Sequence, residues 1–180
     1  MANIPWGMVR KATRLLLRAL NKGGSQGKSG DANGGSTQGA PSGAKARYLR
    51  KGAPLPKFDY APARDGDADP GEVVWTWVPY EEDGSRGKDR PVLVLAYSGA
   101  EVICAQLTSK DHDRDAAQEA RWGRYWMDIG TGNWDSKRRP SEVRLDRLLS
   151  VPQDAVRREG GRLNKHTYSQ VVAQIQKIQG

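Results

Sequence analysis

The chain has 180 residues, the length of one ordinary domain with a tail. Apolar residues make up 37% of it, and no apolar run approaches the ~18 residues that a membrane-spanning helix needs. The single cysteine, Cys104, excludes an internal disulfide and any metal site built from several cysteines. Basic residues interrupt the apolar ones near the N-terminus, so we expect no secretory signal and a reducing, cytoplasmic location.

The net charge of +8 is concentrated in the first third of the sequence. Residues 1–68 hold 12 of the 29 basic residues but only 4 of the 21 acidic ones, so residues 69–180 are neutral as a whole. The basic character therefore belongs to a tail. Any binding of nucleic acid by the remainder must come from local patches of charge.

Residues 1–21 are predicted to form a basic amphipathic helix that begins at Pro5. Arg10, Arg14 and Arg18 lie along one line of this helix without an acidic neighbour. Such a helix can contact an anionic membrane surface, a groove on a partner protein or a nucleic acid. The alternative is a partly formed helix that binds nothing alone, because isolated helices of this length are marginal. Peripheral membrane contact through this segment therefore stays open.

Residues 22–68 are predicted to be a flexible linker rich in Gly, Ser and Pro. Its first part, residues 22–46, contains no aromatic residue and no Leu, Ile or Val, so it cannot offset the entropy cost of ordering. We expect residues 47–68 to be extended and mostly disordered, with Phe58 and Tyr60 as the side chains able to dock on the following domain.

Residues 69–180 are predicted to form one small β-barrel or half-barrel with a C-terminal helix. The stretch is long enough to bury its own core. Composition and spacing predict strands, polar loops, a helical turn from Pro152 to about Gly160, and an amphipathic final helix. The predicted strands are 71–80, 90–97, 101–107, 125–129 and 142–151, the loops are 81–89, 108–124 and 130–140, and the helix is 165–178.

Three motifs occur in a fixed order along this domain. An apolar strand carries Gly71, Glu72, Val73, Val74, Trp75 and Pro79, the next begins with Arg90-Pro91, and the third ends in Gln106-Leu107-Thr108-Ser109. A weaker match follows over 141–151. In this order and spacing the motifs resemble the PemK/MazF family of toxin–antitoxin endoribonucleases, and the resemblance extends over residues 70–178.

The resemblance implies a mainly β fold, an SH3-like, partly open barrel of the PemK/MazF/CcdB type with a C-terminal helix, assembled as a homodimer. It implies cleavage of single-stranded RNA, including mRNA, at short sequences without a metal or other cofactor, and inhibition by a cognate antitoxin protein. Arg90 and Thr108 match the two catalytic positions of the family. The family often has a Glu in the preceding loop and sometimes a His before the Arg, where this chain has positions near Ser85 and Asp89.

Metal-free cleavage of RNA uses the 2′-hydroxyl of the substrate as nucleophile, so a base, a phosphate ligand and an acid are needed. The planar guanidinium of Arg90 suits the phosphate, and the hydroxyl of Thr108 can donate to it. Without the resemblance, an ion pair of Arg90 with Asp89 or Glu82 and a turn-capping role for Thr108 are the more ordinary interpretations.

The sequence offers two candidates for the general base, His112 and Glu82. A solvated loop is the ordinary interpretation of the sequence around His112. A metal site at Asp111, His112 and Asp113 is not expected, because adjacent residues of an extended chain rarely converge on one ion.

Further residues are candidates for RNA contact because basic, hydroxyl and aromatic side chains together bind phosphates and stack on bases. They are Ser85, Arg86, Lys88, Ser109, Lys110, Trp122 and Trp126. For the aromatic residues, cover over an open barrel end is the alternative.

Two functions therefore remain. The first is a sequence-selective endoribonuclease that acts as a toxin. The alternative is a non-catalytic module of the same barrel fold that binds DNA or a protein.

Overall fold

The computed structural model describes residues 45–112 and 116–180. The predicted helix at 1–21 and the first part of the predicted linker lie outside the described residues. Within the described part, no helix is long and apolar enough to cross a lipid bilayer.

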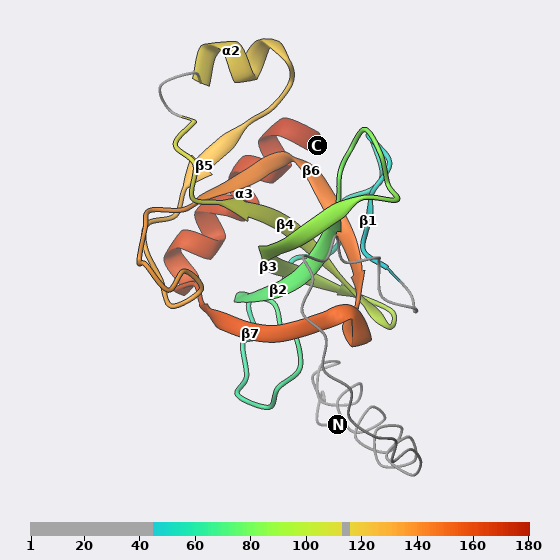
Figure 1. Ribbon diagram of the computed structural model, residues 1–180, viewed down its shortest axis with the longest axis vertical. Helices are drawn as coiled ribbons and strands as arrows, with labels where there is room; N and C mark the ends of the chain where they lie inside the picture. The colour runs from blue at the N-terminus through green and yellow to red at the C-terminus, as the bar shows by residue number, and fades with distance from the viewer. Residues whose placement is uncertain (1–44, 113–115) are drawn as a thin grey trace, which may run out of the picture. The chain divides into compact units, whose positions relative to one another are not determined.

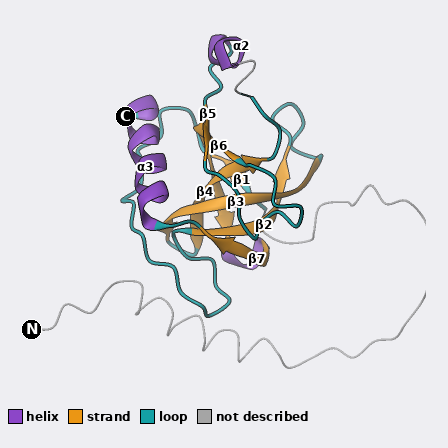
Figure 2. Ribbon diagram, turned by 90° about the vertical axis from the view of Figure 1, so that its left-hand side faces the viewer, coloured by secondary structure: helices purple, strands orange, loops and turns teal. Residues whose placement is uncertain are grey.

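A curled antiparallel sheet forms the body of the protein, with strand order β1-β6-β4-β3-β2-β7 and β5 paired with β6 (Figure 1). Its strands are β1 (Arg47–Tyr48), β2 (Glu72–Pro79), β3 (Gly87–Ser98), β4 (Glu101–Thr108), β5 (Trp126–Asp128), β6 (Glu142–Pro152) and β7 (Val156–Arg162). The helices are α2 (Ala116–Arg121), a 3-10 turn at Gln153–Ala155, and α3 (Lys165–Gln179). Figure 2 shows α3 lying along one side of the sheet. The expected mainly β half-barrel with a C-terminal helix is confirmed.

The central strand β3 explains why the sheet has a core on both faces. Residues 92–96 form an uninterrupted apolar run, and all five are completely buried. Because side chains alternate along a strand, Leu93 joins the cluster under α3, whereas Val92 and Val94 join the opposite cluster. The lone cysteine, Cys104, belongs to this second cluster, and burial raises the pKa of its thiol.

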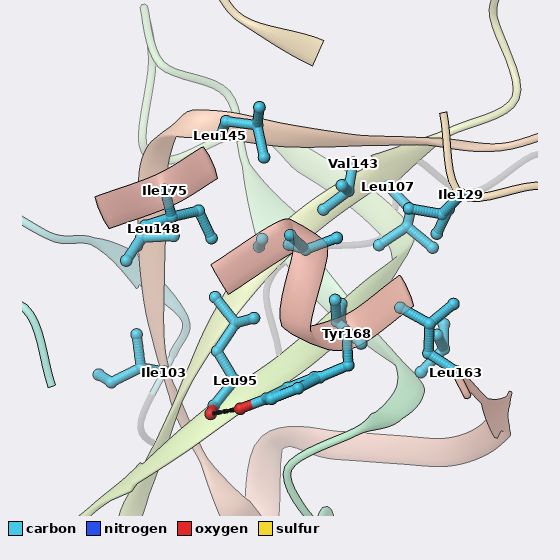
Figure 3. Packing of buried hydrophobic residues seen from close by; sticks show 14 of the residues in the cluster. Leu95, Ile103, Leu107, Ile129, Val143, Leu145, Leu148, Leu163, Tyr168 and Ile175 are labelled. Atoms are coloured by element: carbon cyan, nitrogen blue, oxygen red, sulfur yellow. Dashed lines mark hydrogen bonds between the residues drawn. The ribbon is translucent and has the colours of Figure 1, made fainter. Parts of the chain in front are cut away.

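The first cluster fixes α3 on the sheet through Tyr168 (Figure 3). A bulge in the β3–β4 pairing leaves Leu95 between the paired residues Val94 and Ala96. The hydroxyl of Tyr168 donates to the Leu95 carbonyl at 2.5 Å and lies 3.1 Å from the Asp59 carbonyl. At its start, α3 is capped by Asn164, whose side chain accepts from the Thr167 amide.

The expectation that residues 47–68 are extended and mostly disordered is wrong, because parts of this segment pack on the sheet. Arg47 and Tyr48 pair with β6, and the Arg47 guanidinium forms two hydrogen bonds with Glu101 at 2.5 and 2.8 Å. Phe58 and Tyr60 pack against the first cluster, as expected for these two, together with Leu49 and Leu55. The low hydropathy of this segment predicted disorder. Its few apolar residues are nevertheless buried, because residues distant in the sequence cover them.

The predicted helical turn after Pro152 is only three residues long, and the chain then forms β7. β7 pairs with β2, so the glycines at 160 and 161 lie within a strand and do not end a helix. Their role is spatial: a Cβ atom at Gly160 would lie 3.1 Å from the Cβ of the buried Trp134. The loop predicted at 108–124 likewise contains the short helix α2.

We predict that Tyr168→Phe lowers the free energy of unfolding by about 1–2 kcal/mol, because the buried Leu95 carbonyl loses its hydroxyl donor. Urea denaturation measures the change. Tyr125→Phe is the matched control, since the Tyr125 ring is 40% exposed, and it should leave the midpoint unchanged. Equal effects of the two substitutions would contradict the proposed role of the hydrogen bond.

Candidate active site

Arg90 lies near the start of β3, next to Pro91, in a half-buried position. It forms no ion pair with any described residue, because its neighbour Asp89 lies 3.7 Å from Arg157 instead. Burial lowers the pKa of the Arg90 guanidinium, although an arginine remains charged at neutral pH. The ordinary interpretation, an ion pair with Asp89 or Glu82, is therefore not found. Among the residues that the structure describes, this half-buried positive charge therefore has no counterion.

Two cavities meet at Arg90 and Lys110, which line both of them. The first, of about 320 Å³, is lined by Glu82 and His112 among others, and we call it the central cavity. The second, of about 290 Å³, is lined by Lys88, Thr108 and Ser109 among others. The structure thus brings Arg90 close to Thr108 on one side and to both candidate bases on the other.

Thr108 ends β4, and its hydroxyl oxygen accepts the backbone amide of Lys110 at 3.1 Å. This is the turn-capping role expected of such a residue. An accepting hydroxyl still has its own hydrogen to donate, so the cap and a contact with a ligand are compatible.

His112 is held in the central cavity by one carboxylate and one aromatic ring. Both oxygens of the Glu142 carboxylate lie 2.9 Å from it, one accepting from the His112 backbone amide and the other facing Nδ1. Trp126 stacks on the imidazole with ring centroids 4.3 Å apart and planes 4° apart. The ordinary interpretation of His112 as part of a solvated loop is therefore wrong.

The floor of the central cavity comes from an irregularity in the β4–β6 pairing. Ala105 pairs with Leu148 and Leu107 with Val143, so residues 144–147 lie opposite the single residue Gln106. Bulges of this kind redirect side chains. Arg144 enters the floor from the bulge, with its side chain only 8% exposed. It donates to Asp146 at 3.0 Å and to Glu81.

Tyr48, on β1, closes the cavity opposite this bulge. Its hydroxyl donates to the Pro79 carbonyl at 3.2 Å, and the Arg147 guanidinium lies 4.7 Å from its ring centroid. Burial raises the pKa of this phenol, so it is neutral at physiological pH.

Only some residues of the loop 81–89 line the cavities of the site. Glu82 is exposed at the edge of the central cavity, and Lys88 lines the Thr108 cavity. Ser85 instead bonds to Asp83 through both its amide and its hydroxyl, which makes a local turn. Arg86 is exposed, and neither Ser85 nor Arg86 lines these cavities. The structure does not bring those two predicted RNA contacts to the site.

The two tryptophans near α2 have different surroundings. Trp126 is partly buried in the cavity wall, and its indole N–H donates to Glu119, which also bonds Arg124. Trp122 is 61% exposed, with the Arg124 guanidinium 4.6 Å from its ring centroid. It lines a third cavity of about 580 Å³, which shares Arg124 and Arg144 with the central cavity. The central cavity therefore adjoins the other two, because it shares lining residues with each of them.

Sequence reasoning missed the residues that build the central cavity around the candidate bases. They are Tyr48, Glu119 and Arg144, which line the cavity, and Glu142, which contacts His112. A charged residue alternating with apolar ones, as in Glu142-Val143-Arg144-Leu145, was the one available signal. Among the described residues, no group of three or more His, Cys, Asp and Glu side chains is placed to hold a metal ion.

We predict that Arg144→Ala lowers the free energy of unfolding by about 3 kcal/mol, because it leaves the largely buried Asp146 carboxylate without its cation. Urea denaturation monitored by tryptophan fluorescence measures the loss. Arg139→Ala is the control, because that exposed arginine pairs with Asp135 at the surface, and we expect little change. A similar small effect for both substitutions would show that the buried pair does not support the cavity floor.

Residues 69–179 match the family model described as PemK-like, MazF-like toxin of type II toxin-antitoxin system. Among solved structures, the chain is similar to Mycobacterium tuberculosis toxin MazF-mt6, with 18% identity, a TM-score of 0.40, and coverage of 59% of this chain and 94% of that one. No curated protein matches the chain. Since the family model spans more than half of the sequence, the chain belongs to the PemK/MazF family of type II toxins.

Proposed function

We propose that this toxin is a sequence-selective, metal-independent endoribonuclease that cleaves single-stranded RNA. Membership of the PemK/MazF family supports a toxin role. The observation that carries the proposal is Arg90, a half-buried guanidinium without an ion pair among the described residues, between a cavity with Thr108 and a cavity with two candidate bases. A phosphate diester is an anion that such a guanidinium can bind with two hydrogen bonds.

The proposed reaction is attack of a ribose 2′-oxygen on the adjacent phosphorus. The new O2′–P bond forms as the P–O5′ bond breaks, which leaves a 2′,3′-cyclic phosphate and a 5′-hydroxyl. Arg90 would stabilise the charge that grows on the phosphate oxygens, and Thr108 would donate a further hydrogen bond. Glu82 and His112 are the candidates for removing the 2′-proton.

The three adjoining cavities favour a binding site that is longer than one nucleotide, which we call the RNA track. Lys88 and Lys110 lie along it and offer positive charge to a phosphate backbone, whereas Arg124 and Arg147, which also line it, are paired with Glu119 and Glu81. The exposed ring of Trp122 offers a face on which a base can stack. Single-stranded RNA has both features, unpaired bases and closely spaced phosphates.

The same basic track fits the partners expected of a type II toxin. An acidic, flexible segment of a cognate antitoxin would complement its charge and cover the central cavity. We also propose that the toxin is a homodimer, as the family resemblance implies, which light scattering of the purified protein would test.

We predict that the purified protein cuts long single-stranded RNA at discrete sites in the presence of EDTA, and that Arg90→Ala lowers kcat by at least about 100-fold. Thr108→Ala should lower kcat by about tenfold, as expected for one hydrogen bond. Mapping of the 5′ ends gives the sites and the recognition sequence.

Arg157→Ala is the matched control, because Arg157 of β7 pairs with Asp89 of β3, across the intervening β2, and lines none of the three cavities. It should cut like the wild type. Intact RNA with a folded wild-type protein would instead favour the non-catalytic module that binds DNA or a protein. Activity that EDTA abolishes and Mg²⁺ restores would contradict metal independence.

We predict that Trp122→Ala raises KM for a short RNA by about tenfold and changes kcat less than twofold, because a stacking contact contributes about 1–3 kcal/mol to binding. Trp122→Phe, which keeps an aromatic face, should retain most of the affinity. Steady-state kinetics on the mapped recognition sequence, extended on either side, separates the two parameters. An unchanged KM for Trp122→Ala would remove this side chain from the RNA track.

A further inference from the structure

The Glu142 carboxylate is buried, and both of its oxygens are used by one residue. It lies at the start of β6, where it pairs with Thr108 of β4 and Asp128 of β5, and it is 6% exposed. One oxygen accepts from the backbone amide of His112, and the other lies 2.9 Å from Nδ1 of the same histidine. This contact fixes both the backbone and the ring of His112 relative to the sheet.

The contact also determines which ring nitrogen carries the proton. An ionised carboxylate is only an acceptor, so the nitrogen that faces it must be Nδ1–H. In the neutral imidazole, Nε2 then has the lone pair. His112 lines the central cavity together with Arg90, and its Nε2 has no hydrogen-bond partner among the described residues. The lone pair thus belongs to a residue in the wall of the cavity where Arg90 would bind phosphate.

The ring cannot easily turn away from this orientation. Trp126 is stacked on it almost in parallel, and Trp126 is itself held by a hydrogen bond to Glu119 at 3.3 Å. Glu119 is in turn fixed by two hydrogen bonds from Arg124, at 2.7 and 3.0 Å. A preorganised base has a lower entropy cost of reaching a reactive geometry than a mobile base has.

The other candidate base, Glu82, has none of this support. It is exposed in the loop 81–89, and no hydrogen bond or ion pair joins its side chain to a described residue.

We propose that His112 is the proton acceptor of the reaction and that Glu142 is the positioning residue that holds it. This inference rests on the proposed ribonuclease function. Nε2 takes the proton of the 2′-hydroxyl as the O2′–P bond forms. The leaving 5′-oxygen takes a proton from water, and the imidazolium returns its proton to solvent. Here a His–Glu pair after β4 supplies the base that the family pattern places in the loop before Arg90.

The tautomer is tested first, by an experiment that needs no substrate. The chain has two histidines, so the His166→Gln variant leaves His112 as the only imidazole in a ¹⁵N-labelled sample. Two-bond ¹H–¹⁵N correlations above the titration range of the ring should show the Nδ1–H tautomer. Glu142→Gln in the same background should shift the population toward the Nε2–H tautomer. An Nε2–H tautomer with Glu142 intact would overturn the inference.

Kinetics on the mapped RNA then separate base from positioning residue. His112→Ala should lower kcat by at least about 100-fold, and added imidazole should restore part of it. Glu142→Gln should lower kcat by about 10- to 100-fold at unchanged KM, the range typical when the partner that orients a functional imidazole is removed. Imidazole should not rescue this variant, because its own imidazole is still present.

Glu101→Gln is the matched control, since Glu101 is a partly buried glutamate of β4 that bonds Arg47 and Ser150 and lines none of the three cavities. It should leave kcat within twofold of the wild type. Two results would overturn the inference: a wild-type kcat for Glu142→Gln, or a larger loss of kcat for Glu82→Gln than for His112→Ala. Neither result would contradict the proposed function, provided that the wild type cuts RNA. A wild type that cuts no RNA would overturn both.

Discussion

The buried guanidinium of Arg144 is the constraint around which the central cavity is built. A charge with so little exposure is tolerated only beside opposite charge and with its hydrogen bonds made. Asp146, two residues along β6, supplies one partner, and Glu81, from the β2–β3 loop, supplies the other. The same pairing therefore fixes the bulge of β6 and the first residue of the loop that faces Arg90. The two carboxylates and the guanidinium thus form one network at the cavity floor.

The bulge has a second consequence for the arrangement of charges. In a regular pairing with β4, residues 144–147 would each face a partner across the strand. On the β4 side they lie opposite Gln106 alone, and Tyr48 of β1, the strand next to β6, contacts the Arg147 guanidinium and lines the central cavity with Arg144. The cavity thus requires the short strand before the barrel as well as the barrel itself. The family match begins at residue 69, so this wall of the site lies outside the matched part of the chain.

Local sequence patterns were sufficient for the elements that carry their own signal. The apolar run at 92–96, the Val- and Trp-rich composition of β2 and the helical spacing of α3 each predicted their element, and the motifs singled out Arg90 and Thr108, which the fold places beside one cavity. The patterns failed where an element is stabilised by distant residues. β1 has two residues and β7 contains two glycines, so neither has a strand composition, and both form because β6 and β2 offer them partners. Glu142 was missed for the same reason: its partner, His112, is thirty residues away.

The position of Cys104 gives the protein an internal reporter of its own opening. The thiol lies in the completely buried middle of β4, between β3 and β6, and it is the only one in the chain. A neutral, buried thiol does not react with an alkylating reagent, because the thiolate is the nucleophile and the reagent cannot reach it. Alkylation must therefore wait until the central strands separate. At low reagent concentration its rate measures the equilibrium between closed and open sheet, and at high concentration the rate of opening itself. The alkylation rate of this single thiol thus reports the free energy of opening of the sheet that carries Arg90 and Thr108.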